Sequence, residues 1–224
     1  MAARPVRSAS LPPEPSTRAI SEGASLLGVV LDAGQVDRLA EYARLLVRWN
    51  RTHNLTAIRG SEQVLTHHLL DSLSLVPHFA RVTRGASARV LDVGSGGGLP
   101  GIVLAIAAPQ ARLTLVDAVQ KKCAFLTQAR LVLDLGNVEV LHHRVEALRG
   151  EPFDVIVSRA LATLAQFVGW TRHLLAPGGC WLAMKGKLPG DELAALPPGV
   201  AADVVRLSVP GLDEDRHLIE LRTA

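Results

Sequence analysis

Apolar residues recur at helical spacing over the first third of the chain. Residues 17–30 form one such stripe, and a second begins at position 32 or 34 and continues to 48, with charged residues on its opposite face. A third helix is expected over 61–74, limited by Pro77, because proline cannot continue a helix interior. The pattern therefore predicts a small helical region over 17–85.

After residue 85 the pattern changes to short β-branched runs that alternate with helical stretches. The expected strands are 89–93, 113–116, 138–141, 153–157 and 180–184, and the expected helices are 99–108, 120–135 and 161–175. Such alternation is typical of βαβ units, which give a parallel sheet with helices on both faces. Two last runs, 202–209 and 216–221, flank a turn-rich segment and predict an antiparallel hairpin. We therefore expect an α/β fold over 86–224, with a mostly parallel seven-stranded sheet and an antiparallel C-terminal hairpin.

Composition narrows the class of protein. The chain has 224 residues, of which 48% are hydrophobic and 20% charged, as in globular proteins. Its longest apolar run, 102–108, is far shorter than the roughly 20 residues that cross a membrane, so no membrane partner is expected. The proline-rich segment 1–16 is predicted to be a disordered tail. Two distant cysteines, Cys123 and Cys180, indicate a reducing compartment.

Charge gives a weaker indication of the partner. The net charge of +3 permits an anionic partner such as RNA without requiring one. Arg44, Arg48 and Arg51 form a basic stripe that fits either RNA phosphates or a solvated helix face. The adjacent histidine pairs 67–68 and 142–143 lack the spacing of metal ligands, so no metal is expected.

The sharpest local signal is the glycine-rich segment 92–101, where a strand passes into a helix. NAD, FAD and S-adenosylmethionine sites all use such a loop. Leu99 stands where a dinucleotide loop carries glycine or alanine, and Asp92 would repel a pyrophosphate but attract a sulfonium or an α-amino group. Asp117, 23 residues after Gly94, fits the ribose of either kind of nucleotide. The loop is therefore predicted to bind S-adenosylmethionine, and a tight turn without a ligand is the alternative.

Several motifs together resemble one known family. They are Trp49–Thr56, His68–Leu73, Asp92–Gly101, Lys121–Leu126, Arg144–Glu146, Ser158–Ala160 and Met184–Gly186. In this order and spacing they resemble the bacterial RsmG (GidB) methyltransferases. The resemblance implies a cytoplasmic, Rossmann-like class I methyltransferase with an N-terminal helical extension, which transfers a methyl group from S-adenosylmethionine to N7 of a guanine in small-subunit (16S) ribosomal RNA. The expected partner is that RNA or a 30S-type ribosomal particle, and the chain is expected to be a monomer.

The resemblance also assigns residues to the site. The cofactor-binding candidates are Gly94, Ser95, Gly96, Leu99, Asp117 at the ribose, Val145 and Glu146 at the adenine, and Arg159. Arg159, at the tip of the fourth strand, would also orient the reactants. The substrate-binding candidates are Asn54, His68, Asp71 and Lys185. His68, Asp71 and Ser72 share one face of a regular helix, which fits a polar wall of the pocket or a local structural network.

The residues also bear on the methyl acceptor. Residues 158–161 read Ser-Arg-Ala-Leu, not the Asn/Asp-Pro-Pro-aromatic loop of exocyclic amine methyltransferases. Cys123 and Cys180 lie in apolar surroundings and are expected to be small buried side chains, not the thiolate that carbon-5 methylation requires. Guanine N7 has an available lone pair and needs no base, so orientation suffices. A methyltransferase for a protein or small molecule and a NAD-binding oxidoreductase remain the alternatives.

Overall fold

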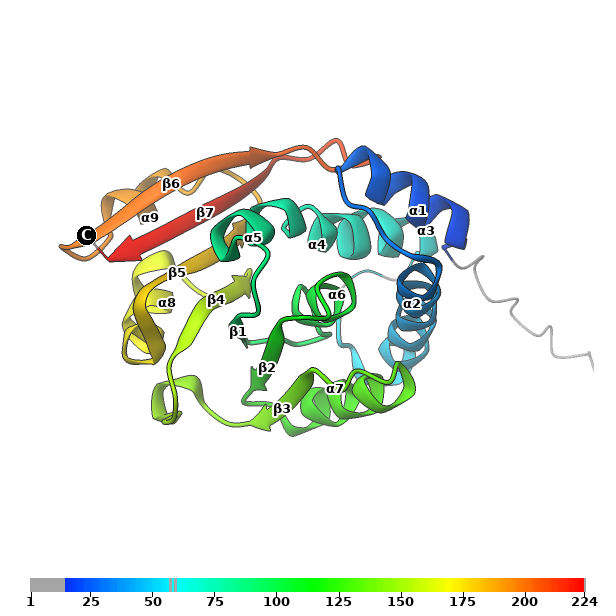
Figure 1. The fold of residues 1–224 in the computed structure, drawn as a ribbon, viewed down its shortest axis with the longest axis horizontal. Coiled ribbons are helices and arrows are strands. Elements are labelled where there is room, and N and C mark those ends of the chain that lie inside the picture. The colour runs from blue at the N-terminus through cyan, green and yellow to red at the C-terminus, as the bar shows by residue number, and fades with distance from the viewer. Residues whose placement is uncertain (1–14, 57, 59, 224) are drawn as a thin grey trace, which may run out of the picture.

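The computed structural model describes residues 15–56, 58 and 60–223 (Figure 1). The predicted tail, 1–16, lies outside the described residues except for its last two positions, where Ser16 caps the first helix by accepting a hydrogen bond from the amide of Ala19. The N-terminal helices are α1 (Thr17–Leu26), α2 (Ala33–His53), α3 (Ser61–Val64), a π-helix (Leu65–Leu70), α4 (Asp71–Leu73) and α5 (Val76–Thr83).

Local sequence explains where the longest of these helices begins. The side chain of Asp32 accepts a hydrogen bond from the amide of Gln35, and the Gln35 side chain accepts one from the Asp32 amide. This capping box satisfies backbone donors that the first helical turn leaves free. At the other end, Asn54 adopts a left-handed conformation with φ of 48°, which asparagine tolerates better than most residues.

The third predicted helix differs from expectation in two ways. Its middle part, Leu65–Leu70, is a π-helix, and helical structure stops after Leu73 before resuming in α5. Pro77, expected to limit one helix, instead lies in the first turn of the next one. Proline is well suited to that turn, since its missing N–H has no partner there in any helix. The sequence pattern did not predict α5.

The sheet has seven strands, as predicted, and their order is β3-β2-β1-β4-β5-β7-β6. They are β1 (Arg89–Val93), β2 (Arg112–Asp117), β3 (Val138–His142), β4 (Phe153–Arg159), β5 (Leu175–Lys185), β6 (Val200–Leu207) and β7 (Arg216–Thr223). Strands β1 to β5 are parallel to one another, while β7 pairs antiparallel with both β5 and β6. The predicted α/β fold with an antiparallel C-terminal hairpin is therefore confirmed.

Helices cover both faces of this sheet (Figure 1). The remaining helices are α6 (Gly101–Ala107), α7 (Gln120–Val132), α8 (Leu164–Thr171), α9 (Gly190–Ala194) and two short 3₁₀ helices, Val145–Ala147 and Arg172–Leu174. One apolar cluster joins the N-terminal helices, α6 and α7 to one face, through residues such as Leu46 and Phe125. A second cluster, with Phe167 and Trp181, joins α8 to the other face. The N-terminal helices thus share a core with the sheet, and the boundary at residue 85 remains a prediction.

None of the described helices combines the length and the apolar character that a membrane span requires.

Candidate active site

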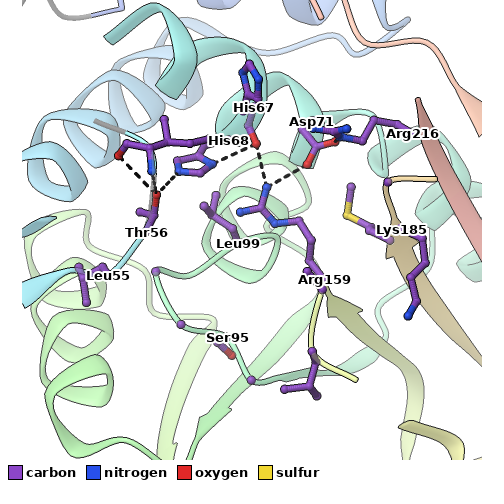
Figure 2. Close-up of a pocket in the computed structure, with 18 of the residues that line it drawn as sticks. Leu55, Thr56, His67, His68, Asp71, Ser95, Leu99, Arg159, Lys185 and Arg216 are labelled. Atoms are coloured by element: carbon purple, nitrogen blue, oxygen red, sulfur yellow. Dashed lines mark hydrogen bonds and ion pairs between the residues drawn. The ribbon is translucent and has the colours of Figure 1, made fainter. Parts of the chain in front are cut away.

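A cavity of about 650 Å³ opens at the carboxyl ends of the parallel strands (Figure 2). Its lining includes the loop after β1, the tip of β4, the beginning of β7 and the helices before the sheet. The predicted residues among its lining are Gly94, Ser95, Gly96, Leu99, His68, Asp71, Arg159 and Lys185. The volume lies in the range typical of small-molecule sites. The structure thus brings together eight candidates that come from both halves of the chain.

The loop after β1 exposes its backbone to this cavity, because its glycines have no side chains. Gly94 and Gly96 have φ angles of 67° and 56°, in the left-handed region that favours glycine. A Cβ atom on Gly94 would lie 2.4 Å from Cδ1 of Leu161, which packs against the loop. Glycine is therefore required at position 94 by both conformation and space, and at position 96 by conformation.

Asp92 lies beneath the loop, outside the cavity lining. Its side chain is fully buried, and its Oδ2 accepts a hydrogen bond of 3.0 Å from the amide of Gly101 at the start of α6. Its Oδ1 has no hydrogen-bond partner among the described residues. Burial raises the pKa of this carboxyl to about 7. The observed contact fixes the turn from strand to helix, and the attraction to a bound cation that the sequence suggested remains a prediction.

The other predicted cofactor residues lie along the same edge of the sheet but outside the cavity lining. Asp117 ends β2, where its carboxylate accepts hydrogen bonds from the amides of Gly96 (3.0 Å) and Val119 (2.9 Å). Val145 is buried and Glu146 exposed, in the 3₁₀ helix that follows β3. Because β4, β1, β2 and β3 are consecutive neighbours, their carboxyl ends form a row at this edge.

Asp71 is the centre of the charged side of the cavity (Figure 2). Its buried carboxylate accepts a hydrogen bond of 2.9 Å from Nη1 of Arg159 and one of 3.1 Å from Nε of Arg216. Arg159 Nη1 also donates to the carbonyl oxygen of His67, at 2.8 Å. Because Arg159 is paired with Asp71, its positive charge near the glycine loop is compensated.

Hydrogen bonds on the same side of the cavity hold His68 in one tautomer. Its Nε2 lies 2.8 Å from Oγ1 of Thr56, and its Nδ1 lies 3.0 Å from the carbonyl oxygen of His67. A carbonyl only accepts, so Nδ1 carries the hydrogen and Nε2 accepts from the Thr56 hydroxyl. Burial, with Arg159 nearby, lowers the pKa of His68 to about 4, so the ring is neutral at pH 7.

The π-helix changes which residues face the cavity. A regular helix would place His68, Asp71 and Ser72 on one face, but only His68 and Asp71 line the cavity. Ser72 is completely buried, and its hydroxyl has no partner among the described residues. A π-helix has more residues per turn than an α-helix, which shifts the angular positions of the residues after it, and of the three residues His68 and Asp71 reach the cavity wall.

The remaining substrate candidates have structural partners. The Lys185 ammonium donates to the carbonyl oxygen of Ala162 (2.7 Å) and to the carboxylate of Glu192 (2.8 and 3.0 Å). Asn54 is the exposed C-terminal cap of α2 and is not among the cavity-lining residues. Their roles in substrate binding remain predictions.

Both cysteines are buried, as expected, and neither belongs to the cavity lining. Burial raises the pKa of Cys123, and it raises that of Cys180 to about 11. Within the described ranges, no three His, Cys, Asp or Glu side chains are grouped so as to hold a metal ion.

Three residues of the site were missed in the sequence: Tyr42, Thr56 and Arg216. Tyr42 donates a hydrogen bond to the carbonyl oxygen of Gly97 and is completely buried. Arg216 lies at the start of β7, 145 positions after the carboxylate that it contacts. No local pattern marks such long-range partners.

Comparison with known proteins identifies the family. The family model described as rRNA small subunit methyltransferase G (GidB) matches residues 35–219. The chain is 55% identical over 208 residues to Ribosomal RNA small subunit methyltransferase G of Burkholderia thailandensis, covering 90% of this chain and 89% of the relative. It is 54% identical over 208 residues to the protein of that name from Burkholderia mallei (strain NCTC 10229), covering 90% of each chain.

Solved structures share the fold at lower identity. A mutant of MtNAS in complex with S-adenosylmethionine aligns with a TM-score of 0.58 and 16% identity, covering 93% of this chain and 77% of that one. TrmN from Thermus thermophilus aligns with a TM-score of 0.53 and 21% identity, covering 71% of this chain and 53% of that one. From the family match and the identity to its relatives, we conclude that this chain belongs to the rRNA small subunit methyltransferase G family.

Proposed function

We propose that this protein transfers a methyl group from S-adenosylmethionine to N7 of a guanine in small-subunit ribosomal RNA. The main support for this proposal is that the glycine loop after β1 and polar side chains from the N-terminal helices and from β7 face the same cavity. A cofactor on the loop and a nucleotide on the polar wall would meet there. Family membership supports the same activity.

The loop fits the cofactor because its backbone is accessible where a side chain would not fit. Besides the close approach of Leu161 to Gly94, a Cβ atom on Gly97 would lie 3.1 Å from Cδ1 of Leu46. We assign Gly94, Ser95, Gly96 and Leu99 to cofactor contacts. When bound, S-adenosylmethionine supplies an electrophilic methyl carbon on a sulfonium.

The row of strand ends suits the length of this cofactor. Arg159 follows β4, the glycine loop follows β1, Asp117 follows β2, and Val145 and Glu146 follow β3. We assign Asp117 to the ribose hydroxyls, since a strand-terminal carboxylate beside the loop is the usual partner of a ribose in such folds. Val145 and Glu146 are assigned to the adenine end, which leaves the methyl group near β4 and β1.

The electrostatics of the wall permit a cationic donor. Asp71 compensates the charge of Arg159 at 2.9 Å, and His68 is neutral at physiological pH because its pKa is about 4. A sulfonium beside this wall would therefore meet little repulsion. Arg159 is assigned to orienting the reactants, since its guanidinium borders the cavity while one nitrogen is fixed by Asp71 and His67.

Transfer to guanine N7 requires little chemistry from the side chains. The N7 lone pair forms a bond to the methyl carbon as the carbon–sulfur bond breaks, and both electrons of that bond stay on sulfur. No proton leaves N7, so no general base is needed. The chain's part is to align the base and exclude water, and alignment alone contributes on the order of 7–11 kcal/mol. The buried thiols of Cys123 and Cys180 give no support to a covalent route.

The substrate is expected to be ribosomal RNA or a 30S-type particle, which the enzyme would meet as a monomer in the cytoplasm. Asn54, His68 and Lys185 are proposed contacts to the RNA, and of these His68 and Lys185 line the cavity.

Two measurements test this proposal. Calorimetry should show binding of S-adenosylhomocysteine and none of NAD. Incubation with S-adenosylmethionine labelled in its methyl group and unmethylated small ribosomal subunits should then place label in material that ribonuclease, and not protease, releases. Binding of NAD instead, or label in protein, would contradict the proposal.

A further inference from the structure

We propose that Arg159 and Arg216 together form a binding site for one backbone phosphate of the RNA substrate, with Asp71 as the residue that positions both guanidinium groups. This inference rests on the proposed function, because it identifies the part of the RNA that the polar wall would hold. Arg216 belongs to none of the motifs that carry the family resemblance.

The three side chains come from three separate elements. Asp71 begins α4, Arg159 ends β4 and Arg216 begins β7. Each oxygen of the carboxylate accepts from a different arginine, Oδ2 at 2.9 Å and Oδ1 at 3.1 Å. The Asp71 side chain is 3% exposed, whereas those of Arg159 and Arg216 are 20% and 17% exposed and line the cavity. The buried acid thus holds two cations at the cavity wall.

Both guanidinium groups keep donors that the protein does not use. Arg159 donates hydrogen bonds through Nη1 alone, to Asp71 and to the carbonyl oxygen of His67. Arg216 uses Nε for Asp71 and Nη1 for Glu214 and the carbonyl oxygen of Asp215. Across the described part of the chain, Nε and Nη2 of Arg159 and Nη2 of Arg216 have no hydrogen-bond partner. A guanidinium has no acceptor, so these donors require one from a ligand or from water.

The surrounding negative charges are either shared or exposed, so they leave room for an anion at this position. Asp71 is already shared by two arginines, and Glu214, which pairs with Arg216 at 3.1 Å, is 59% exposed and therefore screened by water. His67, 3.4 Å from Glu214, also faces this cluster. The other cation at this end of the cavity, Lys185, is already bound to Glu192. Asp71 and Glu214 compensate the two guanidinium groups only in part, and a phosphate would supply further negative charge.

A phosphate fits these donors better than the guanine base does. Arginine forks match phosphate oxygens in a planar, paired geometry, and charge-assisted bonds of this type are roughly twice as strong as neutral ones. A guanidinium on the N7 edge of the base would occupy the atom that must attack the methyl carbon. Two arginines on a neighbouring phosphate would fix the nucleotide and leave N7 free.

The test is the salt dependence of binding to unmethylated small ribosomal subunits. Each lost phosphate contact reduces the slope of log affinity against log salt concentration by about one. We expect this reduction for Arg216→Gln and for Arg159→Gln. Arg112→Gln is the matched control, because Arg112 begins β2 at the opposite edge of the sheet and is exposed. It removes the same charge and should leave the slope unchanged.

Kinetics separate phosphate binding from a structural role. Arg216 should bind the phosphate with equal strength in the ground state and in the transition state. Arg216→Gln should therefore raise KM for the subunits at least 10-fold and leave kcat within about 2-fold. Its affinity for S-adenosylhomocysteine should equal that of the wild type. If Arg216→Gln does not fold, Arg216→Lys replaces it. Its salt slope should be unchanged because the positive charge is kept, and its KM should rise about 10-fold because an ammonium lacks the planar fork of a guanidinium.

The outcomes are distinguishable. A salt slope of Arg216→Gln equal to that of the wild type, a control that loses as much slope, or an Arg216→Lys enzyme with the wild-type KM would overturn the phosphate site. If the wild-type enzyme neither binds nor methylates the subunits, the proposed function fails and the phosphate site fails with it.

Discussion

The phenolic hydroxyl of Tyr42, in α2, donates a hydrogen bond to the carbonyl oxygen of Gly97, in the loop after β1. Tyr42 is completely buried, and burial raises the pKa of its hydroxyl far above the ordinary value, so the group stays a donor at any physiological pH. This bond connects the N-terminal helices directly to the glycine loop. The helices are therefore part of the support of the proposed cofactor site.

Replacement of Tyr42 by phenylalanine should weaken both stability and cofactor binding. Tyr42→Phe leaves the Gly97 carbonyl without its side-chain donor, which costs about 1–3 kcal/mol for a buried group. We expect a loss of this size in urea unfolding and a several-fold weaker affinity for S-adenosylhomocysteine. Thr171→Val is the control, since it removes a buried hydroxyl that lies away from the loop, where it donates to the Phe167 carbonyl and accepts from the indole N–H of Trp181. It should lose stability and keep the affinity, and a Tyr42→Phe protein with wild-type affinity would refute the connection.

Gly94→Asp should abolish binding of S-adenosylhomocysteine while the protein remains folded. The new side chain would be strained at a φ of 67°, would press against Leu161 and would place a carboxylate where the cofactor is proposed to lie. Calorimetry should detect at least a 100-fold weaker affinity. Gly178→Asp is the control, because Gly178 has a φ of 77° but open space around it. It should carry similar backbone strain and bind normally; equal binding by both variants would count against the site.

The buried carboxyl of Asp92 should make stability depend on pH in a specific direction. Burial raises its pKa from 3.8 to about 7. A raised pKa means that the folded state holds the proton more tightly, so this group stabilises the fold at low pH and that stability is lost as pH rises through 7. The pKa of His68, lowered to about 4, acts in the opposite direction, with stability lost as pH falls below 6.5.

The Asp92→Asn variant isolates the contribution of this carboxyl, because His68 is present in both proteins. Asparagine cannot ionise, so the variant should gain stability relative to the wild type by about 2–3 kcal/mol between pH 5 and pH 8. Urea unfolding at the two pH values measures this difference. A difference that stays constant with pH would show that Asp92 is ionised throughout.

Cys123→Ala and Cys180→Ala should retain methyl transfer. Both thiols are buried and outside the cavity lining, and an alanine in either place removes only a small buried group at a cost on the order of 1 kcal/mol. Methyl transfer to unmethylated subunits, with unfolding as a parallel check, measures both effects. Loss of activity in a folded variant would revive covalent catalysis.

The sequence predicted the features that local pattern determines. Alternating runs located all seven strands, and the glycines at 94 and 96 marked the loop that needs a left-handed backbone. The pattern failed where geometry depends on distant partners or on an irregular turn. It missed the contact between Arg216 and Asp71, and it treated Leu65–Leu70 as a regular helix.

The identity of the methylated nucleoside tests the central claim most directly. Unmethylated small ribosomal subunits are incubated with the enzyme and with S-adenosylmethionine labelled in its methyl group, and the RNA is digested to nucleosides for mass spectrometry. We expect the label in 7-methylguanosine from a single position. Label in another nucleoside, or in no nucleoside although the enzyme binds S-adenosylhomocysteine, would contradict it.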